Sequence, residues 1–208
     1  MSAPALSALE DGEPNDALDP TGTDGLRIVD AVLDGITRHD ATYRETELVR
    51  ASVNGGRFTN CRFIDVRFDG LDAPDLVAAS STWRDTEVIG SRLGTAGLYD
   101  ATVSSLRFER CKIGFLGLQG AEVHDLLVEG CTIDELDLTE AKLTRVALRD
   151  TTIAELRLAR ARLSNVDLRG ATLGAVSPTM GLHGAVITVE QLLDLAPVLA
   201  HEAGIHVD

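Results

Sequence analysis

Large apolar side chains recur at every fifth position along most of this chain. Written in fives from Ala41, the sequence begins ATYRE TELVR ASVNG GRFTN CRFID VRFDG, and the same frame runs unbroken to residue 175. The central residue is large and apolar in 25 of these 27 fives, and the two exceptions are Ala73 and Ala78. The leading residue is small or aliphatic, while the other three are mostly polar or Gly. Each five therefore offers two residues to a shared core.

A period of five fits neither an α-helix nor a flat strand, whose periods are about 3.6 and 2 residues. The leading and central residues lie on the same side of a short extended segment, and continued alternation would turn the fifth residue inward as well. That fifth residue is usually Asp, Glu, Gly or Arg. The backbone must therefore bend before each new five, and regular bends wind it into parallel coils about 4.8 Å apart.

Fives such as VDLRG and LDLTE resemble the pentapeptide repeat family, whose usual five is Ala, Asp or Asn, Leu and two variable residues. The array from residue 26 to 178 carries this resemblance, and the frame extends back through LRIVD and AVLDG. The resemblance implies an all-β fold, a right-handed quadrilateral parallel β-helix with four fives in each coil. It also implies a non-enzymatic binding or scaffolding protein.

With 20 residues in a coil, positions 20 apart should stack, and the sequence agrees. Large leading residues gather on two opposite faces, and small ones such as Cys111 and Cys131 on the faces between. The outward residues Glu47, Arg67, Glu87 and Arg107 alternate in sign. Cross-strand pairing favours such alternation, so we expect a column of ion pairs.

The segments outside the array differ from it in composition. Residues 1–25 hold six acidic residues and no Lys or Arg, so we expect a disordered acidic tail. Residues 179–208 should form a helical cap on the last coil or a dimerisation segment. Thr188 and Gln191 have capping-box spacing, Gly204 is a stop signal, and Pro197 should kink or split the helix. The apolar stripe that would cover the coil or a second copy consists of Leu192, Leu195 and Leu199.

The first coil contains one anomaly, because Arg38 occupies a central and therefore inward position. An unpaired buried guanidinium is costly, so we expect residues 36–40 to deviate from the regular wall.

Residues that could carry chemistry have structural explanations. The three cysteines, Cys61, Cys111 and Cys131, lack zinc-site spacing, and stacked Cys111 and Cys131 are best read as small core thiols. Trp83 should stack between Phe63 and Val103 in the core. The five histidines show no nucleophile or ligand spacing. We therefore expect no catalytic residues, no cofactor and no metal, and the lack of a long apolar run or signal sequence predicts a cytoplasmic protein with no membrane partner.

An uncharged surface is the first candidate for binding. Tyr99 and Phe115 should point outward beside Gly97, Gly117 and Gln119. Such a flat patch suits a partner protein or a second protomer, although small residues there could simply ease tight corners. The preferred hypothesis is a protein-interaction module whose partner the sequence does not identify.

The excess of acidic residues suggests an alternative function to the protein-interaction module. With 19 Lys and Arg against 33 Asp and Glu, direct binding of nucleic acid is not expected. Some members of the resembled family bind DNA gyrase and are thought to mimic the DNA duplex, which protects the enzyme from quinolones. The two terminal segments hold most of the net charge of −14, leaving −4 for the array, where Arg and acidic residues mix. The one like-charged column consists of Glu45, Asp65 and Asp85.

Overall fold

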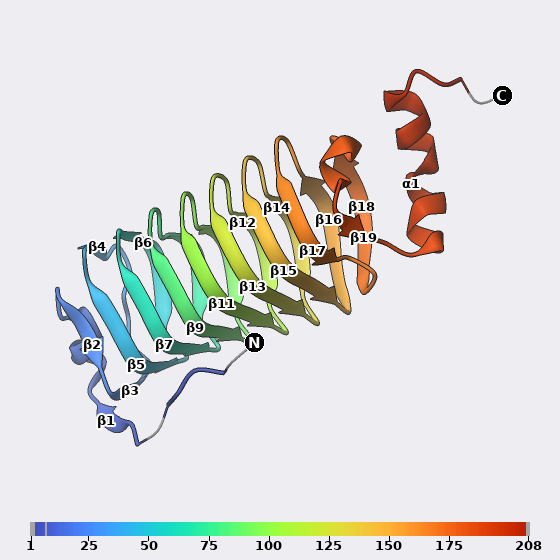
Figure 1. Cartoon of the computed structure of the whole chain (residues 1–208). Coiled ribbons are helices and arrows are strands. Elements are labelled where there is room, and N and C mark those ends of the chain that lie inside the picture. Colours follow the sequence, from blue (N-terminus) through green and yellow to red (C-terminus); the bar gives the residue numbers. More distant parts are fainter. Residues whose placement is uncertain (1–2, 7, 207–208) are drawn as a thin grey trace.

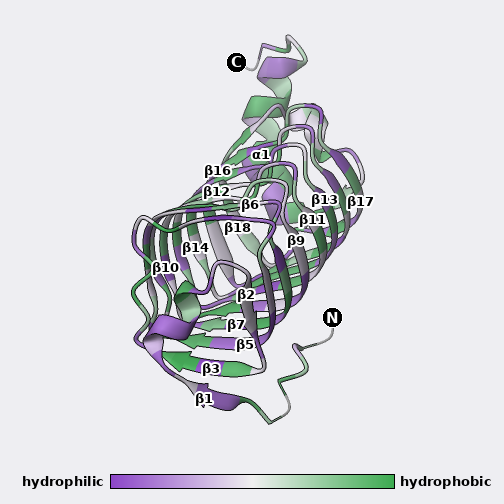
Figure 2. Ribbon diagram, turned by 90° about the vertical axis from the view of Figure 1, so that its left-hand side faces the viewer, coloured by the Kyte–Doolittle hydropathy of each residue, from purple (hydrophilic) through white to green (hydrophobic). Residues whose placement is uncertain are grey.

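The computed structural model describes residues 3–6 and 8–206, which wind into a parallel β-solenoid of about 9 turns with one helix at its C-terminal end (Figure 1). The expected all-β fold with a helical C-terminal segment is therefore confirmed. Each full coil contributes one strand to each of two parallel sheets, and hydrophobic and hydrophilic residues alternate along those strands (Figure 2).

Within the described residues, the first sheet has 11 strands and the second has 8. The 11-stranded sheet consists of β1 (Glu10–Gly12), β2 (Gly22–Asp24), β3 (Leu26–Val29), β5 (Thr42–Val49), β7 (Arg62–Asp69), β9 (Thr82–Ile89), β11 (Thr102–Glu109), β13 (Glu122–Glu129), β15 (Lys142–Arg149), β17 (Arg162–Asp167) and β19 (Ala185–Val186). The 8-stranded sheet consists of β4 (Thr37–His39), β6 (Ser52–Thr59), β8 (Asp72–Val77), β10 (Arg92–Gly97), β12 (Lys112–Gly117), β14 (Thr132–Asp137), β16 (Thr151–Arg157) and β18 (Ala171–Ser177). The helical elements are the 3₁₀ helices η1 (Pro14–Leu18) and η2 (Thr179–Leu182) and the α-helix α1 (Val189–Glu202).

The corners of the coil explain the period of five. In one full coil Glu45, Arg50, Gly55 and Asn60 have φ values of 43°, 52°, 74° and 55°, so the chain turns through the left-handed region at the fifth residue of these fives. Four corners give four sides. The partner of residue n is residue n + 20, as in the pairing of Thr132 with Thr152.

Inward side chains stack in ladders. The rings of Tyr43 and Phe63 are stacked with centroids 5.2 Å apart, and those of Phe63 and Trp83 with centroids 4.3 Å apart. All three side chains are buried, so this aromatic ladder belongs to the core, as its inward positions indicated. Cys61, Cys111 and Cys131 are also buried and form no disulfide.

The N-terminal segment is ordered where the sequence indicated disorder. From Glu10 to Asp24 it folds over the first coil: β1 pairs with β3 and β2 pairs with β5. Ala17 in η1 is buried at the end of the core. The tail prediction therefore fails over residues 10–24, because backbone pairing with the first coil supplies the stability that a highly acidic segment cannot obtain from apolar burial.

Arg38 is accommodated by the same N-terminal segment. Its guanidinium donates hydrogen bonds to the carbonyl oxygens of Leu18 and Thr37. Strand β4 pairs with β6 in regular register, with Arg38 opposite Phe58. The expected deviation of residues 36–40 is thus not observed, since the charged end of Arg38 lies beneath the N-terminal cover instead of in the apolar core.

At the other end, the array stops at a proline. Coil after coil, a backbone N–H donates to the carbonyl 19 residues later, as from Leu138 to Arg157 and from Leu158 to Ser177. The next donor in this series is Pro178, which has no N–H, so the ladder cannot continue. Helix α1 follows, with the predicted Thr188–Gln191 capping box, and it runs unbroken through Pro197, contrary to a split helix.

Candidate interaction surfaces

The structure brings together the residues of the uncharged surface, here called the aromatic–glycine patch (Gly97, Tyr99, Phe115, Gly117, Gln119). A Cβ on Gly97 would lie 2.6 Å from the Tyr99 ring, and a Cβ on Gly117 would lie 2.7 Å from both the Tyr99 and Phe115 rings. Tyr99 and Phe115 are half-buried. Their rings thus lie against bare backbone, in space that a side chain at either glycine would occupy.

Gln119 gives this patch a polar border. Its side-chain Nε2 donates a 2.8 Å hydrogen bond to Asp137 Oδ2. Its Oε1 is buried and accepts no hydrogen bond from any described residue. Sequence reasoning missed Asp137, although the 20-residue stacking places it directly after Gly117 in the same column.

The stacking of β5, β7 and β9 brings the residues of the acidic column onto one corner of successive coils. Glu45, Asp65 and Asp85 each sit at a left-handed corner and are half-buried, and none forms an ion pair within residues 3–6 and 8–206. The backbone N–H of Ala5 donates a 3.1 Å hydrogen bond to Asp65 Oδ1. The N-terminal segment therefore crosses the middle of the acidic column, a contact without any sequence signal.

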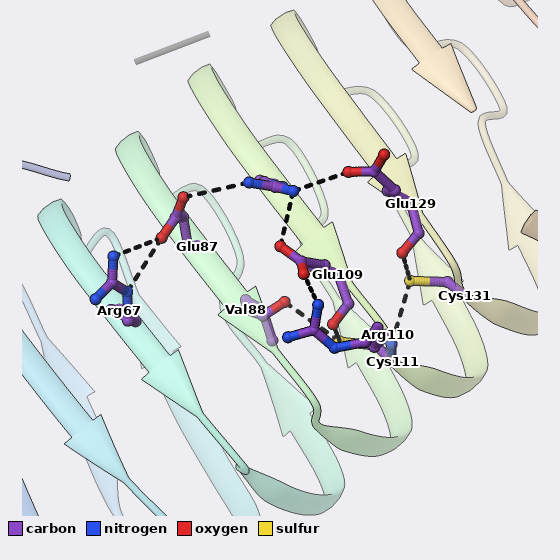
Figure 3. A network of polar contacts seen from close by, with 9 residues as sticks. Arg67, Glu87, Val88, Glu109, Arg110, Cys111, Glu129 and Cys131 are labelled. Carbon is purple, nitrogen blue, oxygen red and sulfur yellow. Dashed lines mark hydrogen bonds and ion pairs between the residues drawn. The ribbon is translucent and has the colours of Figure 1, made fainter. Parts of the chain in front are cut away.

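The column next to it is neutralised internally. Arg67 lies 3.0 Å from Glu87, whose other carboxylate oxygen lies 3.9 Å from Arg107, and Arg107 in turn contacts Glu129 at 2.8 Å (Figure 3). Glu87 is buried although it points outward. The predicted ion pairs therefore exist, and they stabilise a charge that burial would otherwise make unfavourable. This face consequently offers few free charges to a partner.

Cys111 and Cys131 lie beside this network. The backbone N–H of Cys111 donates to Cys131 Sγ over 3.3 Å, and the Cys111 thiol donates to Val88 O over 3.3 Å (Figure 3). The hydrogen bond to Cys131 and burial raise the pKa of the Cys111 thiol. A protonated buried thiol is a poor nucleophile. Over the described residues, no group of three or more His, Cys, Asp or Glu could hold a metal ion.

The leucine stripe of α1 divides between two environments. Leu195 is 4% exposed and packs into the core cluster, and Leu199 is partly buried against it, whereas Leu192 is 48% exposed. Gln191 is buried and its Nε2 donates 2.7 Å hydrogen bonds to the carbonyl oxygens of Leu168 and Ala171. Sequence reasoning identified Gln191 only as a helix cap and missed this second role.

Glu202 holds the far end of the same helix. Its carboxylate accepts hydrogen bonds from the backbone N–H and the hydroxyl of Thr179 in η2, with a distance of 3.0 Å from Thr179 N to Glu202 Oε2. Helix α1 is therefore attached at both ends. Among the described residues, no helix is long and apolar enough to span a membrane.

Comparisons with known proteins test whether this chain resembles the pentapeptide repeat family. Residues 133–170 match the family model for pentapeptide repeats in eight copies. No curated protein matches the chain. Of the solved structures, full-length QnrB1, described as a plasmid-mediated fluoroquinolone resistance protein, is 16% identical with a TM-score of 0.33, and the match covers 94% of this chain and 95% of that chain. A trypsin-treated variant of QnrB1 is 16% identical with a TM-score of 0.31, over 97% of this chain and 98% of that chain. The resemblance to the pentapeptide repeat family is thus confirmed, and its model identifies residues 133–170.

Proposed function

We propose that this chain is a non-enzymatic protein-interaction module whose partner protein binds the aromatic–glycine patch. One observation carries the proposal: the Tyr99 ring lies against Gly97 and Gly117, and the Phe115 ring against Gly117, on a solenoid whose other faces carry many paired charges. Aromatic side chains supply much of the binding energy in protein interfaces. Gln119 Nε2 is bound to Asp137 Oδ2 at 2.8 Å, which holds the polar border of the patch in place.

The test removes the rings and leaves the core. In affinity enrichment with the purified protein as bait, Y99A/F115A should retain at least about tenfold less of a specific partner, since truncated hot-spot residues cost about 2 kcal/mol or more. Alanine at the exposed Lys112 and Thr132 of the same sheet is the matched control. Unchanged enrichment, or a large fall in melting temperature for Y99A/F115A, would count against the proposal.

The acidic column supports a second candidate, a protein that binds DNA gyrase by mimicking DNA. Its support is the stack of three carboxylates, Glu45, Asp65 and Asp85, without an ion pair in the described chain. A supercoiling assay with and without a quinolone tests this function. Dose-dependent inhibition that E45Q/D65N/D85N loses would favour it, whereas no effect at many-fold excess over gyrase would eliminate it.

A homodimer through the C-terminal segment is consistent with either candidate. The face of α1 that points away from the coil exposes Val189 and Leu193 at 74% and 67%, beside the exposed Leu192. Burying such side chains against a second copy is favourable. Light scattering should give twice the monomer mass, and L193K should reduce it to the monomer value; a wild-type monomer at every concentration would contradict the homodimer.

A further inference from the structure

The last strand of the 8-stranded sheet has one open edge. Strand β18 pairs with β16 on one side, and no described strand lies on its other side. Inside this sheet, the carbonyl just before or at the start of a strand accepts a hydrogen bond from the following coil, as Cys131 O does from Thr152 N. At Ala171 the side chain of Gln191 replaces that donor. The Gln191 side chain therefore donates a hydrogen bond to the first residue of β18, and no following strand pairs with the rest of β18 among the described residues.

A groove runs along this open edge. It has a volume of about 380 Å³ and lies between β18 and α1, which stands beside the last coil in Figure 1. Thr172, Leu173 and Gly174 line the strand side, and Glu190 and Asp194 line the helix side. Thr172 and Gly174 are exposed, and Leu173 is only half-buried although it occupies an inward position. The groove thus offers unpaired backbone and an apolar floor to an extended chain.

The charge of the groove is acidic. Glu190 and Asp194 are exposed, and neither forms an ion pair with a described residue. The one base that lines the groove, Arg169, is already bound to Asp167 through contacts of 2.9 and 2.7 Å. Residues 176–208 contain no Lys or Arg. A cationic ligand would therefore meet two carboxylates without an ion pair, and the one positive charge nearby is already paired with Asp167.

We infer that this groove binds an extended basic peptide segment, which adds as a strand to β18 and places Lys or Arg side chains against Glu190 and Asp194. Addition of a strand to a sheet edge draws affinity from the backbone and specificity from alternate side chains. The spacing fits, because residues four apart on a helix are about 6 Å apart along its axis and alternate residues of a strand about 6.6 Å. The inference concerns a surface separate from the aromatic–glycine patch.

The test uses fluorescence anisotropy of a fluorescein-labelled ten-residue peptide of alternating Lys and Val, titrated with the full chain. E190Q/D194N should weaken binding at least tenfold. D72N/D134N, which removes the same number of charges from exposed positions on earlier strands of the same sheet, should bind as the unmodified protein does. Methylation of alternate peptide amides should also weaken binding at least tenfold, because a strand needs its N–H groups.

Three results would overturn the inference. The unmodified protein does not bind the Lys-Val peptide, or both double variants bind it equally, or the N-methylated peptide binds as tightly as its parent. If the peptide does not bind, light scattering shows whether the protein is a dimer. A dimer that excludes the peptide would mean that a second copy of the chain occupies the groove, which also overturns the inference. Y99A/F115A should bind the peptide normally, so that this test and the test of the proposed function can fail independently.

Discussion

The two ends of the solenoid are closed to different degrees. At the first coil, the segment from Glu10 to Asp24 folds across the open end, adds β1 and β2 to one sheet and provides a carbonyl for Arg38. At the last coil, a single helix is attached through Gln191, Leu195 and Glu202, and the edge of β18 stays free. The comparison shows that backbone pairing closes the first coil, whereas at the last coil the short strand β19 pairs with β17 only, a few side chains hold α1, and the edge of β18 retains a groove.

The largest change in stability that tests this difference is expected from two leucines of the same inward column. Leu33 is 2% exposed in the first coil, and Leu173 is half-buried in the last coil. Leu33→Ala should lower the free energy of unfolding by about 3 kcal/mol, and Leu173→Ala by about 1 kcal/mol, because the cost of a truncation grows with burial. Urea titrations measure both values. Equal losses would mean that the two ends are equally well packed.

A medium-sized effect is expected at Gln191. Gln191→Met keeps the length of the side chain but leaves the carbonyl oxygen of Ala171 without a donor, whereas Leu168 O keeps its hydrogen bond from the backbone N–H of Ala171. One buried unpaired acceptor costs about 1–3 kcal/mol, so stability should fall by about 2 kcal/mol.

Thr188→Ala is the control for Gln191, since it disturbs the same capping box without touching those two carbonyls. It should cost about 1 kcal/mol, the usual value for loss of an N-cap. If both variants lose the same stability by urea titration, Gln191 acts only as a helix cap.

The smallest expected effect is the dependence of stability on pH that arises from Asp167. The hydrogen bond from Arg169 lowers the pKa of Asp167 to about 2. A lowered pKa in the folded state adds stability above the unfolded pKa of about 3.9, and this stability is lost as the pH falls through about 2. Asp167 is 40% exposed, so solvent screening limits the contribution to below about 1 kcal/mol.

Melting temperatures from pH 2 to 7 give the corresponding measurement. The unmodified protein should be slightly more stable than D167N at neutral pH, and the difference should vanish near pH 2. A difference that grows on acidification would contradict the assignment.

The repeats could be predicted from the sequence because each inward position is defined by its neighbours at a spacing of 20. That spacing correctly placed Glu87 between Arg67 and Arg107. The ends could not be predicted in this way. Residues 10–24 contain few apolar side chains and obtain order from backbone pairing, which leaves no compositional signal. The groove depends on where α1 stands relative to β18, and no repeat specifies that position.

In the regular coils, the pairing of residue n with residue n + 20 also determines how such a chain can change in length. Insertion or deletion of 20 residues within the array would add or remove one whole layer, and both end structures would keep their orientation. Insertion of five residues would instead shift everything beyond it by one side of the square. Helix α1 would then leave from a different face, a quarter turn away from its present position relative to the N-terminal cover.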